Sequence, residues 1–358
     1  MIEFEAIADI GNNLAIAASN KFNGLFEVNL SNGECKFICF FPNEDMGQKR
    51  LYIKAVCVKD KVIFVPYAAK CIAIYNVTTQ KIKMIAIKEL EGLEIPKSYD
   101  RKNKFSDVVE YGNFIFMTPC TYPAMLKLDS ETEEITYCSS VLSSIKFCFR
   151  RSPCVDGRYI YLPSTVDNII FRFDMESNCG AIFHVGEQNH GTWSVCKVGD
   201  NIWTAPQSEG AVVRWNVKNN KVKEQLEYPA QFCGNGFLFT KIWNLENSLY
   251  LLPAYANMLV RIDMDTLSLV DSKLLKLGKN SVVYFLFELG EWLYLKICSD
   301  GTEKYMRLSM RNLRLEEYIF RLVVGKEIIE ANYYLNTDNV IKEKNANDLA
   351  NYIYQITK

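Results

Sequence analysis

The chain has 358 residues and a formal net charge of −1 at pH 7. Its hydrophobic content of 49% and aromatic content of 13% suffice for a buried core, which excludes an intrinsically disordered protein. A near-neutral chain has no bulk attraction for nucleic acid or for an anionic membrane, so we expect neither as a partner.

The sequence gives no sign of export or membrane insertion. Residues Met1 to Glu5 lack the basic and apolar regions of a signal peptide. The apolar stretch from Val282 to Ile297 is interrupted by Glu288 and Glu291, so it is too short for a spanning helix. We therefore expect a soluble, cytoplasmic protein.

The twelve cysteines favour the same compartment. They include no Cys-x-x-Cys pair and no Cys/His cluster with zinc spacing. Several fall inside predicted strands, where a free cysteine behaves as a small hydrophobic residue: Cys57, Cys71, Cys138, Cys148 and Cys196. We expect reduced, structural thiols.

A turn signature recurs seven times along the chain, at intervals of 42 to 53 residues. In each copy an apolar strand ends in Asn or Asp, or in Ser in the last copy, and a short polar turn follows. This period, with several short strands per repeat, is typical of a β-propeller with one blade per repeat. The anchor residues are Asn29, Asn76, Asp129, Asp174, Asn216, Asp263 and Ser309.

Taken in chain order, each repeat divides into four strands, A to D. The fourth repeat shows the pattern, with strand A at 147–155, B at 159–163, C at 169–174 and D from about 180 to 185. We predict an all-β, seven-bladed β-propeller of four-stranded antiparallel blades over residues 1–320. The predicted blades span residues 4–41, 51–88, 105–140, 147–186, 192–228, 236–275 and 282–320.

Three further columns support this alignment. The A–B turns carry residues that adopt positive φ: Asn12-Asn13, Asp60, Gly112-Asn113, Asp156-Gly157, Gly199-Asp200 and Gly290. Strand B ends in proline, which donates no ladder hydrogen bond, at Pro66, Pro119, Pro163, Pro206 and Pro253. A basic residue stands two positions before the anchor, at Lys127, Arg172, Arg214, Arg261 and Arg307, and we interpret it as a charge on a solvated strand face.

Residues 321–358 depart from the repeat. Arg321 to Tyr334 reads as strand or connector, and Asn345 to Thr357 as a short amphipathic helix with Leu349, Tyr352 and Ile353 at helical spacing. We expect this short C-terminal helical tail to pack against the propeller, with docking on a partner as the alternative. The first and last repeats both look complete, so the propeller can close without a strand shared between the termini. Either Met1 to Phe4 or the segment after Phe320 can still supply one, which leaves the closure open.

Seven units with tight A–B hairpins and an Asx-initiated C–D turn resemble the broad group of repeat propellers that includes the NHL, YVTN and streptogramin-lyase-like families. The resemblance covers about residues 4–320 and implies the fold. In the lyase branch, histidines and a glutamate around a bound metal do the chemistry. This chain has only His184 and His190, so no catalytic residue is carried over.

The one cluster that suits a metal or acid–base site is His184-x-x-Glu187-x-x-His190. His184 falls on an outer strand and His190 in the D–A connection, so their rings need not converge. We therefore expect no metal and no cofactor. His190 is the better catalytic candidate, because it directly precedes Gly191, Thr192 and the start of an innermost strand.

The D–A and B–C loops share one face of a propeller, and loops on a rigid scaffold commonly bind ligands. Here they combine cations, which suit a carboxylate or phosphate, with aromatic and amide side chains that stack and hydrogen-bond. The predicted ligand-binding residues are Lys49, Arg50, Tyr67, Arg101, Tyr122, Arg150, Arg151, Trp193, Gln207 and Tyr255.

The sequence favours a binding or scaffolding propeller that holds a peptide, a glycan or an anionic small molecule on this face. The alternative is a lyase or hydrolase acting on a sugar or modified peptide, with His190 as general base and an arginine stabilising the anion that develops. A third interpretation is an interaction hub that uses the C-terminal tail. The sequence contains no Gly-x-Ser-x-Gly elbow, and the carboxylate pairs Asp100/Asp107 and Glu187/Glu209 are weak candidates.

Overall fold

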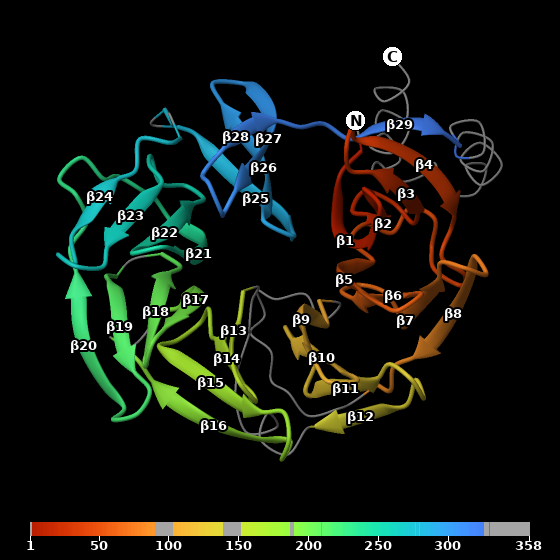
Figure 1. Cartoon of the computed structure of the whole chain (residues 1–358), viewed down its shortest axis with the longest axis horizontal. Helices are drawn as coiled ribbons and strands as arrows, with labels where there is room; N and C mark the ends of the chain where they lie inside the picture. Colours follow the sequence, from red (N-terminus) through yellow and green to blue (C-terminus); the bar gives the residue numbers. More distant parts are fainter. Residues whose placement is uncertain are drawn as a thin grey trace, which may run out of the picture. The chain divides into compact units, whose positions relative to one another are not determined.

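A computed structural model of the chain describes residues 2–89, 103–138, 152–186, 190–208, 210–275, 277–278, 280–325 and 329. Its strands form seven sheets, in each of which consecutive strands are neighbours (Figure 1). The fold is the predicted one, an all-β, seven-bladed β-propeller of four-stranded antiparallel blades. Two compact units are distinguished within the chain, and each is described separately.

Unit 1 contains the described residues of Met1–Lys88, Leu286–Gly290 and Glu317–Lys358. Blade 1 is a five-stranded sheet of β1 (Phe4–Gly11), β2 (Leu14–Ser19), β3 (Leu25–Asn29), β4 (Glu34–Cys39) and β29 (Arg321–Val324). Blade 2 comprises β5 (Tyr52–Val58), β6 (Lys61–Pro66), β7 (Cys71–Asn76) and β8 (Lys81–Ala86).

Unit 2 contains the described residues of Glu89–Phe285 and Glu291–Glu316. Blade 3 comprises β9 (Phe105–Tyr111), β10 (Phe114–Pro119), β11 (Met125–Asp129) and β12 (Ile135–Cys138). Blade 4 comprises β13 (Cys154–Asp156), β14 (Tyr159–Pro163), β15 (Ile169–Asp174) and β16 (Cys179–His184). Blade 5 comprises β17 (Thr192–Val198), β18 (Asn201–Pro206), β19 (Val212–Asn216) and β20 (Lys221–Leu226).

Blade 6 comprises β21 (Phe239–Leu245), β22 (Ser248–Pro253), β23 (Val260–Asp263) and β24 (Leu269–Asp271). Blade 7 comprises β25 (Val282–Leu289), β26 (Trp292–Ser299), β27 (Thr302–Ser309) and β28 (Leu315–Glu317). The second strand ends in proline in blades 2 to 6, as the sequence predicts. A strand end is the place where the missing N–H costs no ladder bond.

The core of unit 2 lies between successive blades. Trp215 of blade 5 packs with Tyr161 and Ile170 of blade 4, and Trp203 of blade 5 packs with Leu251 and Ile262 of blade 6. Both tryptophans are 1% exposed or less. Burying a large apolar side chain contributes about 1.5–3 kcal/mol, so these sandwiched residues hold neighbouring blades together.

The seven anchor residues all close the turn between the third and fourth strands. Each uses a side-chain oxygen to accept backbone N–H groups two or three residues further on, as Asn29 does from Ser31 at 2.9 Å and Asn76 from Thr79 at 2.7 Å. Ser309 performs the same task with its hydroxyl, accepting from Arg311 and Asn312 at 3.2 Å. The equivalent bonds occur at Asp129, Asp174, Asn216 and Asp263.

A second recurrent bond ties this turn to the A–B turn of the same blade. The residue after each anchor donates its backbone N–H to a carbonyl of the A–B turn, for example Leu30 to Asn13 at 2.8 Å and Met310 to Glu291 at 2.7 Å. The other donors are Val77, Ser130, Met175, Val217 and Met264. Both hairpins of a blade are therefore fixed to each other at one end of its sheet.

The A–B turns use positive φ, but in two blades at residues other than those expected. Asn12, Gly112, Gly157, Gly199 and Gly290 have φ between 55° and 59°. In blade 2 the left-handed position is Lys59 (φ 58°) instead of Asp60, and in blade 6 it is Glu246 (φ 51°). Non-glycine residues seldom adopt this conformation, so the residue types at these two positions did not predict positive φ.

The basic column on the third strand is not solvated as the sequence suggested. All five side chains are half-buried, and four of them lie over aromatic rings of the same blade. Lys127 Nζ is 3.7 Å from the centroid of Phe114, and the guanidinium of Arg307 is 4.4 Å from that of Trp292. Arg172 lies similarly over Tyr159 and Phe183, and Arg214 over Trp203. Cation–π attraction accounts for their position.

The chain returns to blade 1 after blade 7. Strand β29 runs parallel to β4 at the edge of the sheet, pairing Arg321 with Glu34 (Figure 1). Just before it, the Tyr318 hydroxyl donates to the carbonyl of Leu30 at 2.8 Å, and the ring of Phe320 packs edge-on against Phe4. The segment after Phe320 thus supplies a fifth strand. The predicted helix at 345–357 lies outside the described residues.

The described cysteines carry free thiols, in line with the structural role expected of them. Burial raises the pKa of Cys35 to about 12, and it also raises that of Cys154. Cys148 lies outside the described residues. Within the described part of the chain, no helix has the length and apolarity needed to cross a membrane.

The turn carboxylates predict an acid-sensitive contribution to stability. Backbone hydrogen bonds hold the pKa of Asp129 and Asp263 below 3.8, and at Asp174 similar bonds outweigh burial, which acts in the opposite direction. A depressed pKa stabilises the fold above the unfolded-state value, and this stability is lost as the pH falls through the folded-state value.

We therefore expect the urea midpoint to fall between about pH 5 and about pH 2.5. It should fall less in a variant with Asp129→Asn, Asp174→Asn and Asp263→Asn, because an amide oxygen still accepts the turn bonds and does not titrate. Parallel pH profiles for the two proteins would contradict this prediction.

Substitution of Gly33 tests how much the contact between the returning chain and blade 1 stabilises the fold. It has φ 75°, and a methyl group there would overlap the carbonyl oxygen of Ile319. Gly11 has φ 89° with nothing within 4 Å of the same position, so it is the matched control. Gly11→Ala should lower the free energy of unfolding by about 1–2 kcal/mol through backbone strain alone. Gly33→Ala should lower it by at least about 1 kcal/mol more, because it adds the overlap with Ile319. Urea unfolding measures both losses. Equal losses would show that the returning segment contributes nothing.

Candidate functional site

In unit 2 the B–C loops and D–A connections lie at the end of the third strand opposite the anchored turns. There the starts of blades 5, 6 and 7 are each bonded to the B–C loop of the preceding blade. Thr192 N–H donates to the carbonyl of Ser164 at 2.8 Å, and Leu238 N–H to that of Gln207 at 2.6 Å. Val283 N–H donates to the carbonyl of Ala254 at 2.8 Å. These bonds give the loops of blades 4 to 7 a fixed backbone frame.

Four aromatic residues on this frame form what we call the aromatic strip: Trp193, Phe237, Tyr255 and Tyr284. The rings of Trp193 and Phe237 are 4.1 Å apart between centroids. The carbonyl of Phe237 accepts the backbone N–H of Tyr255 at 2.9 Å, and the side chains of Tyr255 and Tyr284 are hydrogen-bonded. The strip thus consists of two side-chain pairs, drawn from blades 5, 6 and 7 and linked by one backbone hydrogen bond.

The strip is accessible at its far end. Tyr255 is 44% exposed and Tyr284 45% exposed, which is unusual for large aromatic side chains in this protein. Partial burial, the neighbouring Tyr255 and the hydrogen bond between the two raise the pKa of Tyr284. The Tyr284 hydroxyl therefore stays protonated at neutral pH.

Gln207 adds a polar group beside the strip. Its backbone carbonyl accepts from Leu238, the residue that follows Phe237, and its side-chain Oε1 is buried with no hydrogen-bond partner among the described residues. An unsatisfied buried acceptor costs about 1–3 kcal/mol, and this one is covered by the protein itself. The sequence-predicted Trp193, Gln207 and Tyr255 come together here.

The other two predicted aromatic residues lie elsewhere. Tyr67 is 5% exposed, beneath the guanidinium of Arg50, which is 4.4 Å from its ring centroid. Tyr122 is 7% exposed and packs on Phe105 with ring centroids 5.0 Å apart. Each of these rings is covered by the protein itself, which leaves little surface for a ligand to stack on.

The predicted cations form no described cluster. Arg50, in unit 1, donates from Nε to Glu5 Oε2 at 2.8 Å, so its charge is already paired. Lys49 beside it is exposed. Arg101, Arg150 and Arg151 lie outside the described residues.

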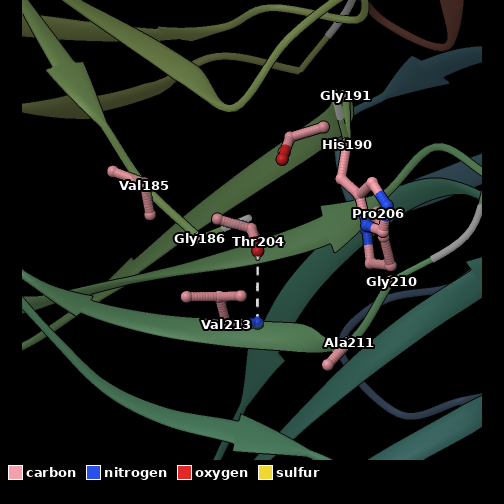
Figure 2. Close-up of a pocket in the computed structure, with 10 residues that line it drawn as sticks. Val185, Gly186, His190, Gly191, Thr204, Pro206, Gly210, Ala211 and Val213 are labelled. Carbon is pink, nitrogen blue, oxygen red and sulfur yellow. Dashed lines mark hydrogen bonds between the residues drawn. The ribbon is translucent and has the colours of Figure 1, made fainter. Parts of the chain in front are cut away.

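His190 lies in a small pocket of blade 5. The pocket holds about 50 Å³ and is lined by the D–A connection and the B–C loop, including Gly191, Thr204 and Gly210. Figure 2 shows the imidazole beside Gly210 and Pro206, with the Thr204 hydroxyl turned to accept the N–H of Val213 at 3.2 Å. A space of this size takes one or two water-sized groups.

The described residues do not place a metal centre at this pocket. His184 is on the exposed outer strand β16, where its Nδ1 is 3.3 Å from Asn168 Oδ1. Glu187 lies outside the described residues, as do Asp100 and Glu209. Within the described part of the chain, no group of three or more His, Cys, Asp or Glu side chains is placed to hold a metal ion.

Sequence reasoning missed Phe237 and Tyr284. Phe237 follows Gly234-Asn235-Gly236, a pattern that indicates a flexible loop and gives no separate signal for the ring after it. Tyr284 begins an apolar strand and reads as an ordinary core residue. Trp193 and Tyr284 each follow the residue that donates to the B–C loop of the preceding blade, so a comparison with Trp193 was the available signal for Tyr284.

Comparison with solved structures reaches the same fold. The chain is similar to a catalytically inactive virginiamycin B lyase from Staphylococcus aureus with quinupristin (14% identity, TM-score 0.53, covering 83% of this chain and 92% of that one). It is also similar to a streptogramin B lyase (12%, TM-score 0.56, 84% and 91%) and to a puromycin-hydrolyzing peptidase of Mycobacterium tuberculosis (13%, TM-score 0.58, 89% and 52%).

At these identities the likeness concerns the fold alone. No protein-family model matches the chain, and no curated protein matches it. The fold is a β-propeller, similar to that of the two lyases.

Gly210 predicts how tightly the His190 ring is held. It has φ 110°, and a methyl group there would lie 2.7 Å from Nδ1 of His190. Gly210→Ala should therefore displace the imidazole and shift its proton resonances in an NMR spectrum. Gly199→Ala, with φ 57° and nothing within 4 Å, controls for backbone strain alone. Unchanged His190 resonances in Gly210→Ala would show that the ring is not confined by the loop.

Proposed function

We propose that this protein is a binding module that holds a peptide segment of a partner across the aromatic strip. The observation that carries the proposal is the strip itself, four rings from three consecutive blades joined by backbone and side-chain hydrogen bonds. Tyrosine and tryptophan dominate the binding energy of many protein interfaces, since they offer large, rigid, amphipathic surfaces.

The neighbouring polar groups suit an extended peptide. The exposed tyrosine hydroxyls at the far end of the strip hydrogen-bond with peptide N–H and carbonyl groups. A glycan offers similar hydroxyl donors but is less apolar than peptide side chains, which fit a surface built mainly of rings. An anionic ligand has less support here, because the strip itself contains no cation and Arg50 is already paired with Glu5.

An enzyme is the second candidate, supported by the pocket beside His190. A general base needs a neighbouring space for the reacting group, and the 50 Å³ pocket supplies one at the same end of blade 5 as the strip. In that case a peptide or sugar held on the strip is the substrate. The solved propellers of similar fold include proteins named as lyases and as a peptidase.

The strip predicts which variants lose binding. The ligand for this test is a peptide selected from an immobilised random-peptide library. Tyr255→Ala and Tyr284→Ala should each lower the binding affinity for this peptide by about 2 kcal/mol, or roughly 30-fold, with the fold unchanged. Affinity is measured by titration of the selected peptide. Val222→Ala is the control, since Val222 is 40% exposed on the outer strand β20.

The same experiment decides between the alternatives. If the wild-type protein selects glycans from a matched array and no peptide, the peptide proposal is wrong. If both tyrosine variants bind the selected peptide as tightly as wild type does, the strip is not the site. Loss of turnover in His190→Ala, with peptide affinity kept, would identify the enzyme.

A further inference from the structure

A second cavity lies away from the aromatic strip, at the outer part of the contact between blades 6 and 7 in unit 2. It has a volume of about 350 Å³, within the range of small-molecule pockets. Its lining combines a cation, a carboxylate, a hydroxyl and apolar side chains: Tyr250, Arg261, Asp271, Ser272, Leu274 and Leu313.

Arg261 reaches this cavity from a row of side chains that crosses blade 6. Trp243, Tyr250, Arg261 and Val270 are directly opposite one another on strands β21 to β24. The rings of Trp243 and Tyr250 stack with centroids 5.4 Å apart and belong to the apolar cluster shared with blade 7. The row therefore carries the guanidinium toward the neighbouring blade.

Arg261 differs from the other members of its column. Unlike the other four, its guanidinium lies over no ring within the described residues. It makes no ion pair there either, and its Nε is buried without a hydrogen-bond partner. Its charge acts only at longer range, where it helps the turn hydrogen bonds to lower the pKa of Asp263. A half-buried guanidinium normally finds a carboxylate or an aromatic face, so this one lacks what its equivalents have.

Blade 7 shows what is missing. There the equivalent Arg307 donates from Nε to Glu316 Oε1 at 2.5 Å. The two blades align through the same backbone bond, Asp263 N–H to Ser268 in blade 6 and Ser309 N–H to Arg314 in blade 7. Glu316, two residues after Arg314, thus corresponds to Val270. In blade 6 a valine occupies the place of the carboxylate, and the next residue, Asp271, lines the cavity together with Arg261.

The charges around the cavity favour a single negative charge. Asp271 is already bound by Lys273, whose Nζ is 2.8 Å from its Oδ2 and whose backbone N–H donates to its Oδ1 at 2.9 Å. Burial alone would raise the pKa of Asp271, but these bonds lower it, so the carboxylate is ionised and paired. Arg261 is left as the uncompensated charge, flanked by Leu274 and Leu313.

We propose that this cavity binds a small monocarboxylate with an apolar body, its carboxylate on Arg261 in the place that Glu316 fills in blade 7 and its apolar part against Leu274 and Leu313. The Ser272 hydroxyl is the further hydrogen-bonding group. This site is independent of the aromatic strip and of any peptide bound there.

The test uses the full chain and two probes of nearly equal shape, 4-methylpentanoate and its neutral amide 4-methylpentanamide, in calorimetric titrations. The carboxylate should bind and the amide should bind at least about tenfold more weakly, because a charge-assisted bidentate bond is lost. No heat from 4-methylpentanoate at millimolar concentration, or equal binding of the amide, overturns the proposal. This comparison requires no variant to fold.

Two variants sharpen the result. Arg261→Met should lower the affinity for 4-methylpentanoate at least tenfold, whereas Lys304→Met, at an exposed lysine of β27, should leave it unchanged. Val270→Glu supplies the carboxylate from within the chain, so it should abolish binding and raise the melting temperature. Unaltered binding in Arg261→Met or Val270→Glu contradicts the assignment. Tyr255→Ala should leave the affinity for 4-methylpentanoate unchanged. A failure of this proposal can therefore be distinguished from a failure of the peptide proposal.

Discussion

The structure depends on one backbone hydrogen bond that recurs in each of the seven blades, from the residue after the anchor to a carbonyl of the A–B turn. The anchor side chain closes the C–D turn beside it by accepting one or two N–H groups. Together these bonds fix both hairpins of a blade at one end of its sheet. The other end, with the B–C loops and D–A connections, is left free of that requirement, and there the blades differ.

This division explains how much of the fold the sequence could predict. Asn, Asp, Gly and Pro act through local chemistry, which is why the strand ends, the turns and the number of blades follow from their spacing. Lys59 and Glu246 adopt positive φ because the surrounding bonds impose it, so no propensity marks them. The parallel pairing of β29 with β4 joins residues nearly 300 positions apart, and no local rule chooses that partner over another.

The candidate site was predicted only in part, for a similar reason. Loop position placed Trp193, Gln207 and Tyr255 on one face, but it does not say whether a ring points outward. Tyr67 and Tyr122 turn into the protein because Arg50 and Phe105 offer them contacts, while Phe237 and Tyr284 complete the strip. The basic column was misread because alternation alone cannot distinguish a solvated face from one that lies against aromatic rings. Its exception, Arg261, became visible only when its partner position was compared with that of blade 7.

The central claim is that the anchored turns hold the blades and the opposite ends of blades 5 to 7 bind the ligand. The most direct measurement is an alanine scan of both ends, with peptide affinity and urea midpoint determined for every variant. The account predicts that variants at anchors such as Asn76 and Asn216 lower the midpoint and retain affinity, while variants of the aromatic strip lose affinity with the midpoint nearly unchanged. Affinity lost at the anchors without loss of stability would contradict it.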